Sequence, residues 1–322
     1  MKKVLVTRKI PEVAVELLKQ HFEVEYDGDD RQMSKEELVE RVRGKDAVLC
    51  LLTDPIDKEV LDAAHGCRIF ANYAVGYNNI DVEHATRKGI LVTNTPGVLD
   101  NATADLAWAL LFAAARRIAE GDRYVRDRKF DSWKATLLLG RDVTGKTLGV
   151  VGGGRIGTNF AKKARGFDMK ILYTGRSRSE DFEKETGGTF VSKEELLRES
   201  DFVSLHVPLN PETKHYISDA ELDMMKDTSV LINTARGPVV DEKALVRALR
   251  EGKIWAAGLD VFENEPLIEE ELYDMKNVVL LPHIGSATIE TREEMGLIAA
   301  RNIVSVLSGE RPQTCVNKEV LK

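Results

Sequence analysis

The stretch "TLGVVGGGRIGTNFAKKAR", Thr147–Arg165, decides the fold. An apolar strand-like run leads into Gly152, Gly154 and Gly157, which have the spacing GxGxxG, and a helix-like run follows them. In this context the first glycine makes a tight turn, the second lets backbone amides approach a pyrophosphate, and the third packs the helix against the strand. The N-terminus of the helix then faces the anion. The stretch therefore predicts a strand–turn–helix unit that binds a dinucleotide.

Strand-like and helix-like runs alternate on both sides of this stretch. Before it, apolar runs such as "KVLVT" (residues 3–7) and "AVLCLL" (47–52) alternate with amphipathic runs such as "SKEELVERVR" (34–43). After it, the alternation continues from "KILYTG" (170–175) to "NVVLLPH" (277–283). Strict alternation is typical of parallel sheets that carry helices on both faces. The predicted fold class is α/β, with two doubly wound parallel-sheet domains, the second of the Rossmann type.

The connection "TNTPGVLDN" (93–101) interrupts the alternation with a proline and a glycine. It leads into "ATADLAWALLFAAARRI" (102–118), the longest run predicted to be helical, which is apolar on nearly all sides. Such a helix is expected to be buried between domains or subunits. We expect the last helix-like run (291–309) to cross back to the first unit. The predicted domains are residues 1–98 with 287–322, a discontinuous substrate domain, and residues 99–286, the dinucleotide-binding domain.

Composition limits the classes of function. The 322 residues suit two domains, and 43% hydrophobic content is enough for two cores. Acidic and basic residues are interspersed, and the net charge is -7. The sequence contains no block of basic residues, which argues against a nucleic-acid partner. No run is long enough to predict a signal peptide or a membrane span. The three cysteines are far apart and form no CxxC motif, so we expect reduced thiols, a cytoplasmic location and no metal site.

The segment "LYTGRSRSE" (172–180) bears on the choice of cofactor. An acidic residue about 20 positions after the glycines would bind the ribose 2'-hydroxyl of NAD, and here it is absent. Instead, Arg176, Ser177 and Arg178 could bind a 2'-phosphate. NADP(H) is therefore favoured, and NAD(H) stays possible. In the alternative, both arginines are solvated on a surface loop. Glu180 is a late candidate for the missing acid, but it lies past the bend.

Six histidines compete for a catalytic role. Only His206 and His283 follow strands of the second unit, and ligands of such sheets bind at the carboxyl ends of the strands. His206 also fits a structural residue at a strand end. His283 follows the apolar run 278–281, while the preceding strand-like run ends at Asp260, Glu263 and Glu265. One strand earlier, Arg236 reaches the same edge.

A guanidinium, carboxylates and an imidazole at one sheet edge suit the reduction of a 2-oxo acid. Arg236 would bind the substrate carboxylate through two hydrogen bonds and polarise the neighbouring carbonyl. His283 would give that carbonyl oxygen a proton as hydride arrives from a nicotinamide. Glu265 would accept a hydrogen bond from the imidazole and fix its tautomer. For each residue alone, an ordinary loop salt bridge is an equal alternative, and only together do they favour catalysis.

With these motifs in place, the chain resembles the D-isomer-specific 2-hydroxyacid dehydrogenase family over essentially its whole length. Within the family it is most similar to the glyoxylate/hydroxypyruvate reductases. The resemblance rests on "NYAVGYNNID" (72–81), "TNTPGVLDNATADLAWALL" (93–111), "VVGGGRIG" (150–157), "NTARGPVVDEKALVRAL" (233–249), "AGLDVFENEP" (257–266) and "LPHIGSAT" (281–288). It implies a flavodoxin-like substrate domain beside the Rossmann domain. It also implies that Arg236, Glu265 and His283 form the family's catalytic set.

The resemblance implies further assignments. Val75 and Gly76 would offer backbone amides to the substrate carboxylate. Asp260 would hold the nicotinamide amide. Arg155 and Ile156 would contact the pyrophosphate, and Thr103 would line the cofactor cleft. The family also implies a homodimer joined through the long helix and its neighbours. Asn78 stands where many relatives have aspartate, which puts one supporting contact in doubt.

Rival functions remain. Glu265 argues against formate dehydrogenases, which have glutamine there, and the chain length leaves no room for the regulatory domain of many phosphoglycerate dehydrogenases. A 2-ketogluconate or other 2-keto-aldonate reductase is the nearest rival, because its substrate is also a 2-oxo acid. Trp133 and Leu137 to Leu139 either line the substrate pocket or belong to the dimer core. A rival of another class is a nucleotide-regulated corepressor, since fold alone does not determine function.

Overall fold

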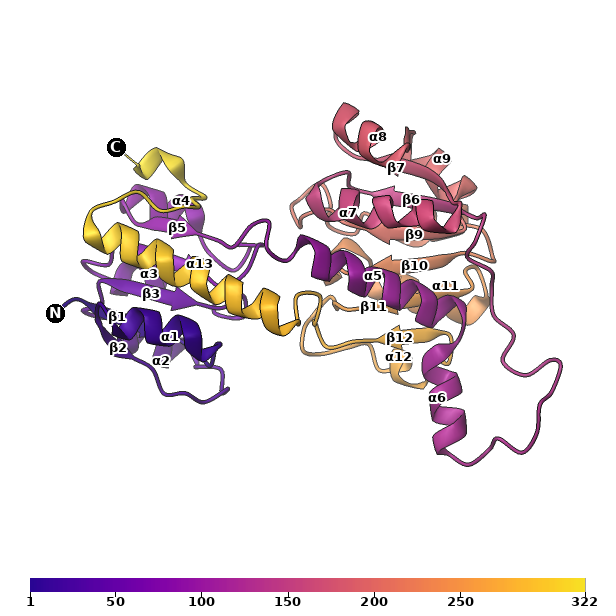
Figure 1. Ribbon diagram of the computed structural model, residues 1–322, viewed down its shortest axis with the longest axis horizontal. Helices are drawn as coiled ribbons and strands as arrows, with labels where there is room; N and C mark the ends of the chain where they lie inside the picture. Colours follow the sequence, from indigo (N-terminus) through magenta and orange to yellow (C-terminus); the bar gives the residue numbers. More distant parts are fainter. Residues whose placement is uncertain (322) are drawn as a thin grey trace. The chain divides into compact units, whose positions relative to one another are not determined.

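The computed structural model describes residues 1–321, and residue 322 lies outside the described part. The chain divides into two compact units, one of residues Met1–Leu99 with the chain from Ser286 onward, the other of Asp100–Gly285. Each unit has one parallel sheet with helices on both faces (Figure 1). The predicted α/β class with two doubly wound parallel-sheet domains is confirmed. Within residues 1–321, no helix is long and apolar enough to cross a membrane.

The first unit has five strands in the order β2-β1-β3-β4-β5, which is the flavodoxin-like order. The strands are β1 (Lys3–Val6), β2 (Glu23–Glu25), β3 (Ala47–Cys50), β4 (Ile69–Asn72) and β5 (Leu91–Thr93). The helices are α1 (Glu12–Lys19), α2 (Lys35–Arg41), α3 (Lys58–Ala63), α4 (Val82–Arg87) and α13 (Ile289–Ser308). Helix α13 packs against α1, β3 and β4, so a C-terminal segment completes a unit built mainly from N-terminal residues (Figure 1).

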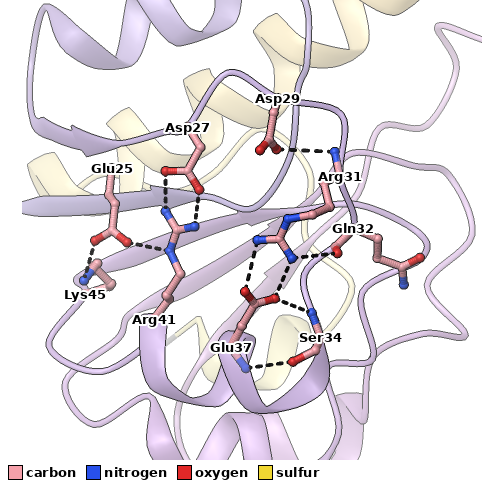
Figure 2. Close-up of polar contacts among 9 residues, drawn as sticks. All are labelled: Glu25, Asp27, Asp29, Arg31, Gln32, Ser34, Glu37, Arg41 and Lys45. Atoms are coloured by element: carbon pink, nitrogen blue, oxygen red, sulfur yellow. Dashed lines mark hydrogen bonds and ion pairs between the residues drawn. The ribbon is translucent and has the colours of Figure 1, made fainter.

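Charged side chains tie helix α2 to the strand at the edge of this sheet (Figure 2). The guanidinium of Arg41 binds Asp27 and lies 2.7 Å from Glu25, a residue of β2. At the start of α2, Ser34 and Glu37 form a reciprocal capping box. The Arg31 guanidinium binds Glu37 and lowers the pKa of that carboxyl to about 2. The Arg41 ion pairs therefore tie the last turn of α2 to the edge strand β2, and the capping box stabilises the first turn of this helix.

The second unit has seven strands in the order β12-β11-β10-β9-β6-β7-β8, which is the Rossmann order with one added strand. The strands are β6 (Thr147–Val151), β7 (Lys170–Thr174), β8 (Thr189–Phe190), β9 (Phe202–Leu205), β10 (Val230–Asn233), β11 (Ala256–Leu259) and β12 (Val278–Leu280). The helices are α5 (Asp100–Ala115), α6 (Ile118–Arg126), α7 (Arg155–Ala164), α8 (Glu180–Thr186), α9 (Lys193–Glu199), α10 (Asp219–Met224), α11 (Glu242–Glu251) and α12 (Glu271–Asp274).

Alternate residues of the central strands enter two different cores. In β10, Val230 and Ile232 pack with apolar residues of α5 and α7. Leu231, between them, packs with residues of α9, α10 and α11 on the opposite face. Every residue of this strand is buried, which suits its three consecutive apolar residues before Asn233. The two cores hold the strand ends in register, and these ends carry the candidate site.

The helix predicted over residues 102–118 is shorter at its C-terminal end than expected. Helix α5 ends at Ala115, and Arg117 then takes a left-handed backbone conformation with φ of 56°, which turns the chain into α6. The expectation that this is the longest helix is wrong, because α13 has 20 residues and α5 has 16. Helix α6 has no buried residue, and with the loop after it projects from the rest of its unit (Figure 1).

Candidate active site

The glycine loop follows β6 and leads into α7, as its motif predicts. Gly152 has φ of +103°, and a Cβ atom there would lie 2.6 Å from the carbonyl oxygen of His206. A Cβ at Gly157 would overlap the carbonyl oxygen of Gly152. A Cβ at Gly154 would meet no protein atom within 4 Å. The first and third glycines are therefore required by the fold, whereas the second leaves open space at the N-terminus of α7, which fits a pyrophosphate.

The first turn of α7 contains Arg155 and Ile156, the residues expected at the pyrophosphate. Arg155 is exposed and makes an ion pair with Asp100, whose Oδ2 atom lies 3.2 Å from Nε. Asp100 is buried at the start of α5, and this burial raises the pKa of its carboxyl although the Arg155 charge opposes the shift. Asp100 lies in the motif of residues 93–111, but nothing in that motif indicated a contact with Arg155, which lies more than fifty residues later in the chain.

The segment after β7 carries the three residues expected at a 2'-phosphate. Arg176, Ser177 and Arg178 are all exposed. Arg178 binds Glu183 of helix α8 through two nitrogens, at 2.8 and 2.7 Å. This ion pair lowers the pKa of the Glu183 carboxyl, and the hydroxyl of Tyr173 donates a third hydrogen bond to it. The sequence did not predict the contact between Arg178 and Glu183, because it suggested only Glu180, and only as a substitute for the ribose-binding acid.

Three neighbouring strands, β10, β11 and β12, end at one edge of the sheet and carry Arg236, Asp260 and His283. The two carboxylate oxygens of Asp260 accept hydrogen bonds from the amides of Ile284 and Gly285, both at 2.7 Å. Asp260 therefore anchors the turn that directly follows His283. Burial raises the pKa of the Asp260 carboxyl.

The imidazole of His283 is bound to the carboxylate of Glu265, with 2.8 Å between Nδ1 and Oε2. Because Nδ1 is engaged with this carboxylate, Nε2 is the ring nitrogen that takes no part in the pair. The other oxygen of Glu265 accepts the amide of Phe262 at 3.0 Å. Burial alone raises the pKa of Glu265, but the hydrogen bond and charge of His283 and the charge of Arg236 hold it below its usual range.

The three carboxylates at this edge, Asp260, Glu263 and Glu265, have different hydrogen-bond partners. Asp260 binds backbone amides, and Glu263 lies 2.6 Å from Nε2 of His215. Only Glu265 pairs with His283. Burial lowers the pKa of the Arg236 guanidinium, and the nearby negative charge of Glu265 opposes that shift. Arg236, Glu265 and His283 therefore interact electrostatically within one unit.

The other expected site residues lie on loops and helix starts. Val75 and Gly76, in the first unit, follow β4, and their carbonyl oxygens accept hydrogen bonds from Asn94 and Asn72, both at 2.8 Å. Thr103, in the second unit, is buried in the first turn of α5, close to Gly285.

His206 has the surroundings of a structural residue. Its Nε2 atom lies 2.9 Å from the hydroxyl of Ser204, and its ring packs against Phe160 with 4.9 Å between the centroids. Burial lowers the pKa of His206 to about 3. With this pKa, the imidazole stays neutral through the physiological range. Its backbone carbonyl lies close to Gly152, so His206 has a structural role where β6 and β9 end.

Known proteins resemble this chain over its full length. The family model for the D-isomer specific 2-hydroxyacid dehydrogenase, NAD binding domain, matches residues 108–285. A glyoxylate reductase of Thermococcus kodakarensis is 56% identical over 324 residues, covering 99% of this chain and 97% of that protein.

Two crystal structures show the same architecture. A protein from Thermus thermophilus is 46% identical with a TM-score of 0.92, covering 98% of this chain and 99% of that one. The NADPH-dependent glyoxylate/hydroxypyruvate reductase of Sinorhizobium meliloti, in complex with NADP and malonate, is 32% identical with a TM-score of 0.89, covering 99% of this chain and 97% of that one. The chain belongs to the D-isomer specific 2-hydroxyacid dehydrogenase family.

Proposed function

We propose that this enzyme reduces glyoxylate and hydroxypyruvate to D-2-hydroxy acids with NADPH. The observation that carries the proposal is the His283–Glu265 pair, 2.8 Å apart, at the same sheet edge as Arg236. Its full-length relative in Thermococcus kodakarensis is named glyoxylate reductase, which supports the choice of substrate. A 2-oxo acid has a carboxylate for the guanidinium and a carbonyl oxygen for the imidazole.

In this proposal, each protein group acts on a different part of the substrate. The bound nicotinamide nucleotide supplies the hydride. Arg236 binds the substrate carboxylate with its planar fork and draws electron density from the adjacent carbonyl. His283 donates a proton from Nε2 to the carbonyl oxygen, and Glu265 stabilises the imidazolium and holds its orientation. The amides of Val75 and Gly76 give the carboxylate a second set of donors.

The same proposal assigns the cofactor contacts. Gly152, Gly154 and Gly157 shape the loop, Arg155 and Ile156 meet the pyrophosphate, and Thr103 and Asp260 lie on the nicotinamide side. Arg176, Ser177 and Arg178 bind the 2'-phosphate and favour NADP(H). These residues are exposed beyond β7, where the adenosine end of a dinucleotide lies in Rossmann folds. An NADP(H) enzyme of this kind works as a reductase where the NADPH pool is kept reduced.

A cytoplasmic homodimer belongs to the same proposal. The segment 118–139 leaves large apolar side chains in water, with Trp133 83% exposed and Phe130 59% exposed. Apolar groups gathered on a projecting segment are typical of a surface covered by a partner. Sedimentation equilibrium of the wild type and of Trp133→Ser tests this, because a dimer that dissociates in the variant supports the assignment. A monomeric wild type contradicts it.

The function is tested by initial rates of NADPH and NADH oxidation with glyoxylate, hydroxypyruvate and 2-ketogluconate, measured side by side. Fast NADPH turnover with the two small acids supports both substrate and cofactor assignments. Preference for 2-ketogluconate keeps the mechanism and changes the substrate. Turnover with none of the pairs contradicts the proposed activity and favours a nucleotide-regulated binding protein.

A further inference from the structure

Glu242 has a buried carboxylate that the proposed mechanism does not use. Its side chain, on the first residue of α11, is only about a twentieth exposed. Its Oε2 atom accepts the backbone amide of Glu263, and its Oε1 atom accepts the amide of Glu269, both at 2.7 Å. These two amides flank Glu265 in the chain. Both oxygens of Glu242 are therefore directed to the loop that carries Glu265.

Capping of helix α11 does not explain this carboxylate. The N-cap is Asp241, whose side chain accepts the amide of Ala244 at 2.9 Å. A carboxylate transferred from water to a buried site costs free energy unless hydrogen bonds replace its hydration. In Glu242 those hydrogen bonds come from the loop after β11. The cost of burying the charge is thus offset only while the loop keeps its position.

The backbone at Gly237, a few residues before Glu242, lies against the same loop. A Cβ atom at Gly237 would overlap the carbonyl group of Phe262 and lie 2.5 Å from the amide nitrogen of Glu263. Gly237 directly follows Arg236. The segment that carries the guanidinium therefore contacts the Glu265 loop twice, through Gly237 at its start and through Glu242 at its end. The positions of Arg236 and Glu265 relative to each other are consequently linked through residues 237–242.

The carboxylate of Glu263 gives the same loop two further contacts. The carboxylate of Glu263 points to His215 at 2.6 Å and accepts the amide of Glu242 at 3.2 Å. Glu242 and Glu263 therefore exchange hydrogen bonds between the amide of one residue and the carboxylate of the other. Glu265, two residues after Glu263, binds a different histidine, His283.

We propose that Glu242 is a positioning residue for the reaction, which holds the 262–269 loop so that Glu265 stays hydrogen-bonded to His283. The inference rests on the proposed function, because it acts through the acid–base pair of that function. Glutamine at this position retains one acceptor oxygen but turns an NH₂ group toward a backbone amide that needs an acceptor. Glu242→Gln therefore releases one side of the loop without changing side-chain volume.

The test compares Glu242→Gln in the wild-type background and in a Glu265→Gln background, with glyoxylate and NADPH as substrates. We expect kcat to fall about 10- to 100-fold in the wild-type background, because small misplacements of catalytic groups have effects of this size. The Kd of NADPH is expected to change less than about twofold, because no cofactor contact is altered. In the Glu265→Gln background, Glu242→Gln is expected to add no further loss. Glu251→Gln, an exposed carboxylate on the same helix, is the matched control.

Two results overturn the inference. An unchanged kcat in Glu242→Gln removes the positioning role, and an equal further loss in the Glu265→Gln background indicates a general structural role. If Glu242→Gln does not fold, Glu242→Asp keeps the charge but cannot reach both amides, and the same comparison applies to it. Absence of turnover in the unmodified protein contradicts the proposed function itself. Turnover in the unmodified protein with an unaffected Glu242 variant contradicts this inference alone.

Discussion

Glu183 binds two nitrogens of Arg178, with 2.8 Å from Nε to Oε1 and 2.7 Å from Nη2 to Oε2. The pair orients the guanidinium beyond the end of β7, but it also occupies the edge that a phosphate would use for a two-point contact. Within residues 1–321, Arg176 forms no salt bridge with a carboxylate. Affinity for a 2'-phosphate is therefore expected to depend on both arginines, with Glu183 competing for one of them.

Replacement of Arg176 and Arg178 by alanine together is expected to raise the KM for NADPH about tenfold or more, because charge-assisted hydrogen bonds are lost. The KM for NADH is expected to stay within about twofold, because NADH has no 2'-phosphate. Initial-rate kinetics with both nucleotides measure this, and Arg198→Ala, an exposed arginine of α9, is the control. An unchanged KM for NADPH in the double variant contradicts the NADP(H) assignment.

The three motif glycines are expected to respond differently to alanine. Gly154→Ala should keep the melting temperature and weaken NADPH binding, because the new methyl group meets open space where the pyrophosphate is proposed. Gly157→Ala should lose about 2 kcal/mol or more of stability, because its methyl group overlaps the carbonyl oxygen of Gly152. Thermal unfolding and fluorescence titration with NADPH separate the two effects. Gly166→Ala, which also meets no atom within 4 Å, is the control. Full NADPH affinity in Gly154→Ala would exclude a close approach of the cofactor there.

His283→Ala is expected to lower kcat by about 10² to 10⁴, the usual contribution of a positioned proton donor. The Kd of NADPH should be nearly unchanged, because the imidazole contacts Glu265 and not the glycine loop. Stopped-flow reduction of glyoxylate and a separate NADPH titration measure the two quantities. Normal turnover in the variant would remove His283 from the mechanism.

The sheets could be predicted from the sequence, because alternation of apolar strands with amphipathic helices is a local property. The strand order and the edge at which Arg236, Asp260 and His283 emerge follow from the parallel connection rules. The helix end at Ala115 could not be predicted, because Arg117 adopts a left-handed conformation that its residue type does not favour. The residues on both sides of this turn have the composition of a helix, so the sequence does not mark the break.

The Glu265–His283 contact was predicted from the sequence, but the partners of the neighbouring carboxylates Asp260 and Glu263 were not. Asp260, Glu263 and Glu265 lie within six residues, and their chemistry is nearly the same. The structure separates them by their partners, which are backbone amides, His215 and His283 in turn. The partners of Asp260 and Glu263 come from distant parts of the chain, so spacing alone could not assign them.

Arg236→Lys is expected to lower kcat/KM for glyoxylate about tenfold or more while the Kd of NADPH stays unchanged. A lysine ammonium keeps the charge but cannot form the two parallel hydrogen bonds of a guanidinium to a carboxylate. Arg236→Gln, which loses the charge as well, is expected to be weaker still. Steady-state kinetics with varied glyoxylate measure both variants. Equal kcat/KM in Arg236→Lys and wild type would show that the geometry of the fork is not required.

His206 makes stability depend on pH. Burial lowers its pKa to about 3 in the folded protein, whereas the unfolded chain has a histidine pKa of about 6.5. Between these values the unfolded state binds a proton that the folded state does not, so stability is full above the unfolded pKa and falls as the pH falls. For one such group, the free energy of unfolding should drop by about 2 kcal/mol between pH 7 and pH 5.

His206→Asn should remove this contribution, because asparagine does not titrate and can still hydrogen-bond to Ser204. Urea unfolding at pH 7 and pH 5 is expected to show a drop for the wild type that exceeds the drop for the variant by about 2 kcal/mol. His21→Asn, an exposed histidine, should retain the wild-type difference. If wild type and His206→Asn lose the same free energy between the two pH values, His206 is protonated equally in the folded and unfolded states. That result would contradict burial of the imidazole as the cause of a lowered pKa in His206.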